Sequence, residues 1–172
     1  MIYYILIFVL LLLMGYQDFK HRAITWYLFP MLFGLLFMRQ IFVNSQLIPD
    51  LLWNILLNIS LIVLIICITS IYFLFKGFSL KSFFTTKIGT GDLFFFICIT
   101  PQFDILNLCF FLIFGSIISL LYQATIFGLS KCFKLKYTSS IPYAGILALL
   151  LIPVLLIRDF QLIDLFSRIH LN

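Results

Sequence analysis

Long apolar runs, separated by short polar clusters, dominate the pattern of the chain. A helix that spans a membrane needs roughly 20 apolar residues, with about 17 to 25 usual. The uninterrupted runs predict six spans, at residues 2–17, 24–42, 51–75, 91–103, 105–129 and 141–157. We therefore expect an all-α, polytopic membrane protein with six transmembrane helices, in which residues 1–172 form a single transmembrane helical domain.

The fourth run is the least regular, because Asp92 opens it and the sequence Pro101-Gln102-Phe103-Asp104 closes it early. Merged with the fifth run it would make one long kinked helix. Proline beside aspartate is more typical of a tight turn, so two separate spans are predicted. The first run has no basic residue before it and no small-residue cleavage site after it. It predicts a retained membrane helix and not a signal peptide.

Composition agrees with a membrane protein. The chain is 64% hydrophobic and 10% charged, whereas soluble domains are on average about half apolar and about a quarter charged. A net charge of +5 would suggest a nucleic-acid partner in a soluble protein. Here the placement of charge in the loops explains it better, so we expect a lipid bilayer and no nucleic acid.

Basic residues are unequally divided between the two sets of loops. In the six-span arrangement, one side holds Lys20, Arg22, Lys76, Lys81, Lys87, Lys131, Lys134 and Lys136, and the other holds Arg39, Arg158 and Arg168. Positively charged loops stay in the cytoplasm. We therefore expect a multi-pass protein of the cytoplasmic (inner) membrane, with both termini on the non-cytoplasmic side.

The acidic residues divide in the opposite way. All six are aspartates, and Asp50, Asp104, Asp159 and Asp164 fall on the outer side. Asp18 ends the first span and Asp92 begins the fourth, so both are predicted at the cytoplasmic boundary. An ionisable residue at membrane depth is a functional hypothesis by default.

Two explanations fit this pair. Asp18 can simply end a helix beside Lys20 or Arg22, and Asp92 can cap a helix start, where negative charge is favourable. Alternatively, two carboxylates on one face share a proton and activate a water molecule, as in an aspartyl protease. The isolation of the pair on that face favours the catalytic hypothesis.

Gly89 and Gly91 flank Thr90 just before Asp92. Glycine allows backbone angles that are closed to other residues and lets another backbone approach closely, so both glycines are candidates for positioning a substrate peptide. The alternative is an ordinary turn at a helix start.

The sequence contains few of the residues that other protease mechanisms require. Without glutamate there is no H-E-x-x-H zinc site. His21 and His170 are predicted on opposite sides of the membrane, which disfavours a histidine base beside a serine or cysteine nucleophile. The four cysteines are scattered without a C-x-x-C pair, so they indicate neither a zinc site nor a disulfide framework. We expect no metal and no cofactor.

Three stretches resemble the prepilin peptidase family of membrane aspartyl proteases, and the likeness covers nearly the whole chain. They are DFKHRAI (residues 18–24), GTGD (89–92) and IPYAGILAL (141–149). The first two resemble the segments with the two catalytic aspartates, and the third resembles a late segment I-P-F-G-P-x-L-A-L. The resemblance implies that Asp18 and Asp92 are catalytic and that the enzyme removes short basic leaders from type IV prepilin-like, single-pass preproteins at the cytoplasmic face.

The chain departs from the family pattern in several places. Thr25 and Phe94 stand where many members have proline and lysine, and Ala144-Gly145 replaces Gly-Pro. The cytoplasmic insert with paired cysteines that carries N-methyltransferase activity in larger members has no counterpart, so cleavage without methylation is expected. The alternatives are a non-catalytic transporter or assembly subunit, an inactive family member, and a presenilin-type protease that cuts within a helix.

Overall fold

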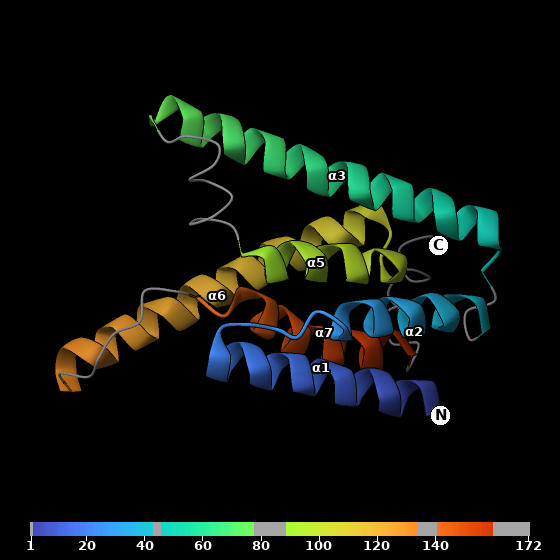
Figure 1. Cartoon of the computed structure of the whole chain (residues 1–172), viewed down its shortest axis with the longest axis horizontal. Coiled ribbons are helices and arrows are strands. Elements are labelled where there is room, and N and C mark those ends of the chain that lie inside the picture. The colour runs from blue at the N-terminus through green and yellow to red at the C-terminus, as the bar shows by residue number, and fades with distance from the viewer. Residues whose placement is uncertain (1, 43–45, 78–88, 134–140, 160–172) are drawn as a thin grey trace, which may run out of the picture.

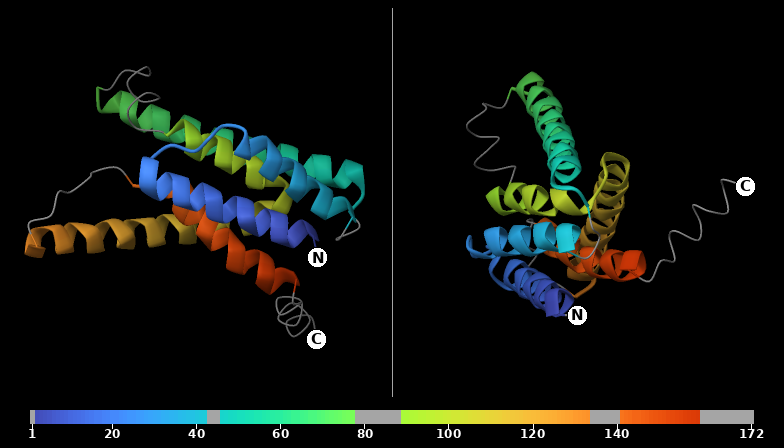
Figure 2. Two further views of the ribbon diagram at one scale, coloured as in Figure 1. Left: turned by 60° about the horizontal axis from the view of Figure 1, so that its bottom comes forward. Right: turned by 90° about the vertical axis from the view of Figure 1, so that its right-hand side faces the viewer.

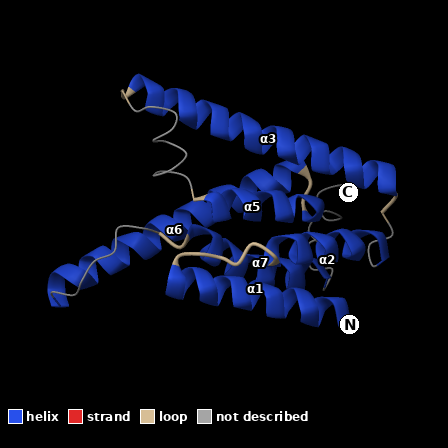
Figure 3. Ribbon diagram, in the orientation of Figure 1, coloured by secondary structure: helices blue, strands red, loops and turns tan. Residues whose placement is uncertain are grey.

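A computed structural model describes residues 2–42, 46–77, 89–133 and 141–159, and the regular elements in these ranges are all helices (Figures 1 and 3). They are α1 (Ile2–His21), α2 (Leu28–Phe42), α3 (Ile48–Phe75), α5 (Thr90–Ile99), the 3₁₀ turn η2 (Thr100–Gln102), α6 (Ile105–Phe133) and α7 (Tyr143–Asp159). The all-α prediction is confirmed for these residues.

Three helices, α1, α3 and α6, are long and apolar enough to cross a membrane. Helices α2 and α7 are shorter apolar helices, and α5 has 10 residues. In the most apolar window of α3, and likewise of α6, only 22% of the residues are buried. Large apolar side chains cover the exposed faces of both helices, which suits contact with lipid and not with water.

The break predicted at Pro101 is present. Helix α5 ends at Ile99, η2 turns the chain, and Phe103 is extended (φ −122°, ψ 145°) before α6 begins at Ile105. Proline lacks the N–H that would continue an α-helical ladder, so the chain tightens into a 3₁₀ turn at this point. The first two spans differ at their ends from the predicted ranges, since α1 continues to His21 and α2 begins only at Leu28.

Helices α1, α2, α5 and α7 form the centre of the bundle, with α1 against α7 and α2, and α2 against α5. Helix α3 packs mainly on η2 and α6, and it lies apart from the centre when the bundle is viewed end-on (Figure 2). One continuous core of buried apolar side chains joins the central helices, with Leu11, Leu32, Phe95 and Leu147 fully enclosed. This core holds the end of α1 close to the starts of α5 and α7.

A buried polar cluster surrounds η2, far along α5 from Asp92. Gln102 Oε1 accepts hydrogen bonds from Arg39 Nη1 (2.6 Å) and Gln40 Nε2 (3.2 Å). Arg39 was predicted near the outer end of the second span, and its burial was not expected: it lies in the last turn of α2 and is fully buried, with its guanidinium over the Tyr4 ring. The apolar run of α2 includes Arg39 because its charge is bound inside the protein and not in lipid.

Asn58 of α3 fixes η2 from the other side. Its Nδ2 donates to the carbonyl oxygens of Thr100 (2.9 Å) and Phe103 (2.5 Å), and the side chain is fully buried. We expect Asn58→Leu to lower the free energy of unfolding by about 1–3 kcal/mol, because buried carbonyls lose their donor.

Thermal unfolding of the purified protein in detergent measures this loss. Asn54→Leu, on the same helix but only partly buried, is the matched control and is expected to have a smaller effect. Equal melting temperatures for the two variants would show that Asn58 does not hold the turn.

Candidate active site

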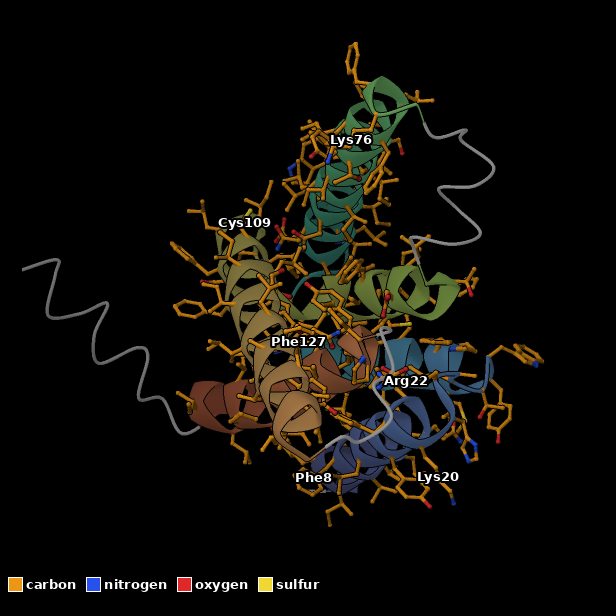
Figure 4. The ribbon with its side chains drawn as sticks, turned by 90° about the vertical axis from the view of Figure 1, so that its left-hand side faces the viewer. Phe8, Lys20, Arg22, Lys76, Cys109 and Phe127 are labelled. Carbon is orange, nitrogen blue, oxygen red and sulfur yellow. The ribbon has the colours of Figure 1, made fainter. Side chains whose placement is uncertain are left out.

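Asp18 lies one turn before the end of α1 and is 8% exposed. The residues after α1 fold back along it, because Gln17 Oε1 accepts hydrogen bonds from the Thr25 backbone N–H (3.0 Å) and the Thr25 hydroxyl (2.6 Å). This closed loop fixes the end of α1 and the side chain of Asp18 with it. Figure 4, seen from this end of the bundle, shows Lys20 at the outer edge and Arg22 nearer the centre.

Asp92 lies in the first turn of α5 and is partly buried. Its backbone N–H donates to the carbonyl of Gly89 (3.1 Å), the residue that caps the helix. The backbone of Gly89 is ordinary (φ −71°, ψ 126°), so the expectation that this glycine supplies unusual backbone angles was wrong. Space explains Gly89 instead: a Cβ atom there would lie 2.7 Å from Asp92 Oδ2.

Gly91, the second candidate for positioning, has a different environment. A Cβ atom there would only touch the Phe29 ring at 4.0 Å, an ordinary contact, and the residue lies within regular helix. The geometry gives no reason why this position must be glycine. A role for either glycine in binding a peptide remains a prediction.

The start of α7 brings the two aspartates together. The backbone N–H of Gly145 donates to Asp18 Oδ2 (2.7 Å), and the N–H of the preceding residue, Ala144, donates to Asp92 Oδ1 (2.9 Å). The first N–H groups of a helix have no partner within the helix and carry partial positive charge. Two carboxylates from distant parts of the sequence therefore satisfy two neighbouring amides of one helix.

The site at the start of α7 contains two acidic side chains and one nearby basic side chain. Asp18 and Asp92 are close enough to interact electrostatically, and Arg22 is the nearby positive side chain that acts on Asp18. The amides that bind them belong to consecutive residues. Neighbouring carboxylates resist simultaneous ionisation, and each amide of α7 stabilises the charged form of the carboxylate that it binds. The arrangement suits a pair that holds one proton between two acids.

Gly145 leaves no free space beside Asp18. A Cβ atom on Gly145 would lie 3.0 Å from both Cβ and Oδ2 of Asp18, and 3.3 Å from the Phe19 ring. Few real Cβ atoms have neighbours this close, so the glycine is required by the approach of α1 to α7.

Two departures from the prepilin peptidase pattern are used structurally. Thr25 and Gly145 both stand at positions where that pattern has proline, which has no backbone N–H. In this chain each N–H is used, by Gln17 and by Asp18 respectively. The departures therefore supply hydrogen bonds that a proline would forbid.

The sequence pattern did not predict that the start of α7, within the IPYAGILAL stretch, binds the two aspartates. The available signal was Pro142 directly before an apolar run, which marks a helix start with unpaired amides. Among the described aspartates, Asp50 and Asp104 are exposed and outside this cluster. No group of three metal-ligating side chains occurs in the part of the chain that the structure describes.

Several sequence-predicted residues fall outside the described ranges, among them Lys81, Lys87, Asp164, Arg168 and His170.

Comparison with models of protein families, with curated proteins and with solved structures gave no match.

Proposed function

We propose that this protein is a membrane-embedded aspartyl endopeptidase that removes the leader peptide of prepilin-like preproteins. One observation carries the proposal: Asp18 and Asp92, from α1 and α5, bind neighbouring backbone amides at the start of α7. All three stretches that resemble the prepilin peptidase family contribute to this one place. The first two supply the carboxylates and the third supplies the amides.

The pair would act by general acid–base catalysis. The ionised carboxylate takes a proton from a water molecule, which attacks the carbonyl carbon of the scissile peptide bond. The protonated carboxyl group donates to the oxyanion that develops, and the leaving amine then receives a proton. Since the two groups titrate as a pair, the roles of Asp18 and Asp92 are interchangeable in this description.

The substrate would be a single-pass preprotein with a short basic leader followed by an apolar helix. In the proposed six-span arrangement the aspartates lie at the cytoplasmic boundary, where such a leader ends. A transporter would instead need its carboxylates along a pathway through the bilayer. Both aspartates lie near helix ends, Asp18 in the last turns of α1 and Asp92 in the first turn of α5, which favours cleavage at the membrane surface.

A cleavage assay tests this function directly. Purified protein in liposomes, incubated with a tagged preprotein, is expected to release the leader, and mass spectrometry of both products is expected to place the cut between the leader and the apolar helix. A cut inside the apolar helix would indicate a presenilin-type protease. Absence of cleavage across a panel of preproteins would favour a non-catalytic membrane protein.

A further inference from the structure

A pair of hydroxyl groups lies beside the aspartates, and the catalytic scheme does not use it. Tyr143, the first residue of α7, directly precedes the amide that binds Asp92. Its hydroxyl is 2.9 Å from Ser116 Oγ of α6, and its ring packs edge-on against Phe96 of α5. Phe96 lies one turn after Asp92 in α5, so the ring of Tyr143 packs within one helical turn of the proposed reaction centre.

The direction of this hydrogen bond can be assigned. Ser116 Oγ donates its only proton to the carbonyl of Leu112, one turn earlier in α6 (2.8 Å). Both hydrogen bonds can form at the same time only when Tyr143 donates to Ser116. Tyr143 Oη then retains acceptor capacity, which another group can use.

The pair lies on a surface where polar groups are otherwise scarce. Ser116 is exposed, and around it on α6 the side chains of Ile113, Phe114 and Ile117 are also exposed, by 56%, 61% and 48%. Ser116 is therefore a polar group on an apolar face, and the half-buried Tyr143 reaches it from α7. The family pattern that the chain resembles has phenylalanine at the position of Tyr143, so the hydroxyl is a feature of this chain.

An extended peptide near lipid requires hydrogen-bond partners from the protein. A peptide bond in a helix is shielded by its neighbours, so the segment to be cut must leave the helix, and its backbone N–H and C=O groups then lose their partners. In or near lipid each unpaired backbone group is costly and must be satisfied by protein. We propose that Tyr143 and Ser116 accept hydrogen bonds from main-chain N–H groups of the preprotein beside the scissile bond, an inference that rests on the proposed function.

Binding to a cleavage-deficient protein tests this role separately from catalysis. In an Asp92→Asn background in nanodiscs, a fluorescent synthetic peptide with a basic leader and an apolar helix is titrated against the protein. Tyr143→Phe keeps the ring against Phe96 and removes only the hydroxyl. We expect it to raise Kd by about 2- to 10-fold, the effect of losing one neutral hydrogen bond, and Ser116→Ala to act in the same direction.

Matched controls lie on α3. Tyr72→Phe and Ser60→Ala make the same chemical changes on an exposed face of that helix and are expected to leave Kd unchanged. In the active protein, Tyr143→Phe is expected to raise KM with kcat nearly unaltered, the behaviour of a group that binds substrate and transition state equally.

The outcomes separate the two proposals. Equal Kd for Tyr143→Phe and Tyr72→Phe would overturn the binding role even if the protein cleaves preproteins. A hydroxyl-dependent Kd without any cleavage by the wild-type chain would support the binding role while the peptidase function fails. A lower melting temperature for Tyr143→Phe, with Kd and KM unchanged, would show that the two hydroxyls only join α6 to α7.

Discussion

Asp18→Asn and Asp92→Asn are each expected to lower the rate of leader release by about 10²- to 10⁴-fold, the range that a positioned general acid or base contributes. Asparagine has nearly the shape of aspartate, and its amide oxygen can still accept the N–H of Gly145 or Ala144. The hydrogen bonds to α7 therefore remain, and only the ability to exchange a proton is lost. The measurement is the initial rate of cleavage of a tagged preprotein in liposomes.

Asp50→Asn is the matched control. The substitution makes the same chemical change at an exposed aspartate in the first turn of α3, away from the site. Its cleavage rate is expected to equal that of the wild-type protein. If both site variants retained wild-type rates, the aspartates would merely cap α7, as their hydrogen bonds to Gly145 and Ala144 would also permit.

Gly145→Val is expected to reduce kcat by about 100-fold, because a displacement of about 1 Å in a catalytic group has an effect of this size. Even a methyl group at this position would lie 3.0 Å from the carboxylate of Asp18, so the larger side chain must push Asp18 away from the α7 amide. Gly145→Ala is expected to lie between the wild type and Gly145→Val, since a smaller displacement relieves the contact.

Gly128→Val is the control for this series, because a Cβ atom at Gly128 of α6 has no neighbour within 4 Å. It is expected to retain both its cleavage rate and its melting temperature. Wild-type kcat in Gly145→Val would mean that the distance between α1 and α7 does not govern the position of Asp18. A series in which kcat falls while KM stays near the wild-type value would separate a catalytic fault from weakened binding.

The start of α7 explains how two carboxylates can be held close to each other. Neighbouring carboxylates repel each other when both are charged, so a site that brings them close needs a compensating positive potential. The start of α7 supplies such a potential to both carboxylates through its backbone amides, in addition to the charge of Arg22 near Asp18. The two amides also fix the geometry, because successive N–H groups in one helical turn have a constant spacing.

The hydrophobic pattern of the chain was sufficient to predict the helical class, the break at Pro101 and the candidate aspartates. Apolar runs of this length leave the backbone few options other than helix, since each helix satisfies its own hydrogen bonds. The pattern did not reveal that Arg39 is buried, because an arginine near the end of an apolar run looks the same whether it faces a loop or the interior. Its burial depends on a hydrogen bond to Gln102, which lies in the 3₁₀ turn η2, in a distant part of the sequence.

Only the tertiary structure decided that the start of α7 joins Asp18 to Asp92, and that Gly89 and Gly145 serve by leaving space for those two carboxylates. Pro142 marks a helix start with unpaired amides, but no residue type in the sequence indicates which side chains those amides bind. Residue types and their spacing determined which acids were available. The packing of α1, α5 and α7 determined where those acids meet, because contacts between distant segments depend on how apolar surfaces fit together in three dimensions.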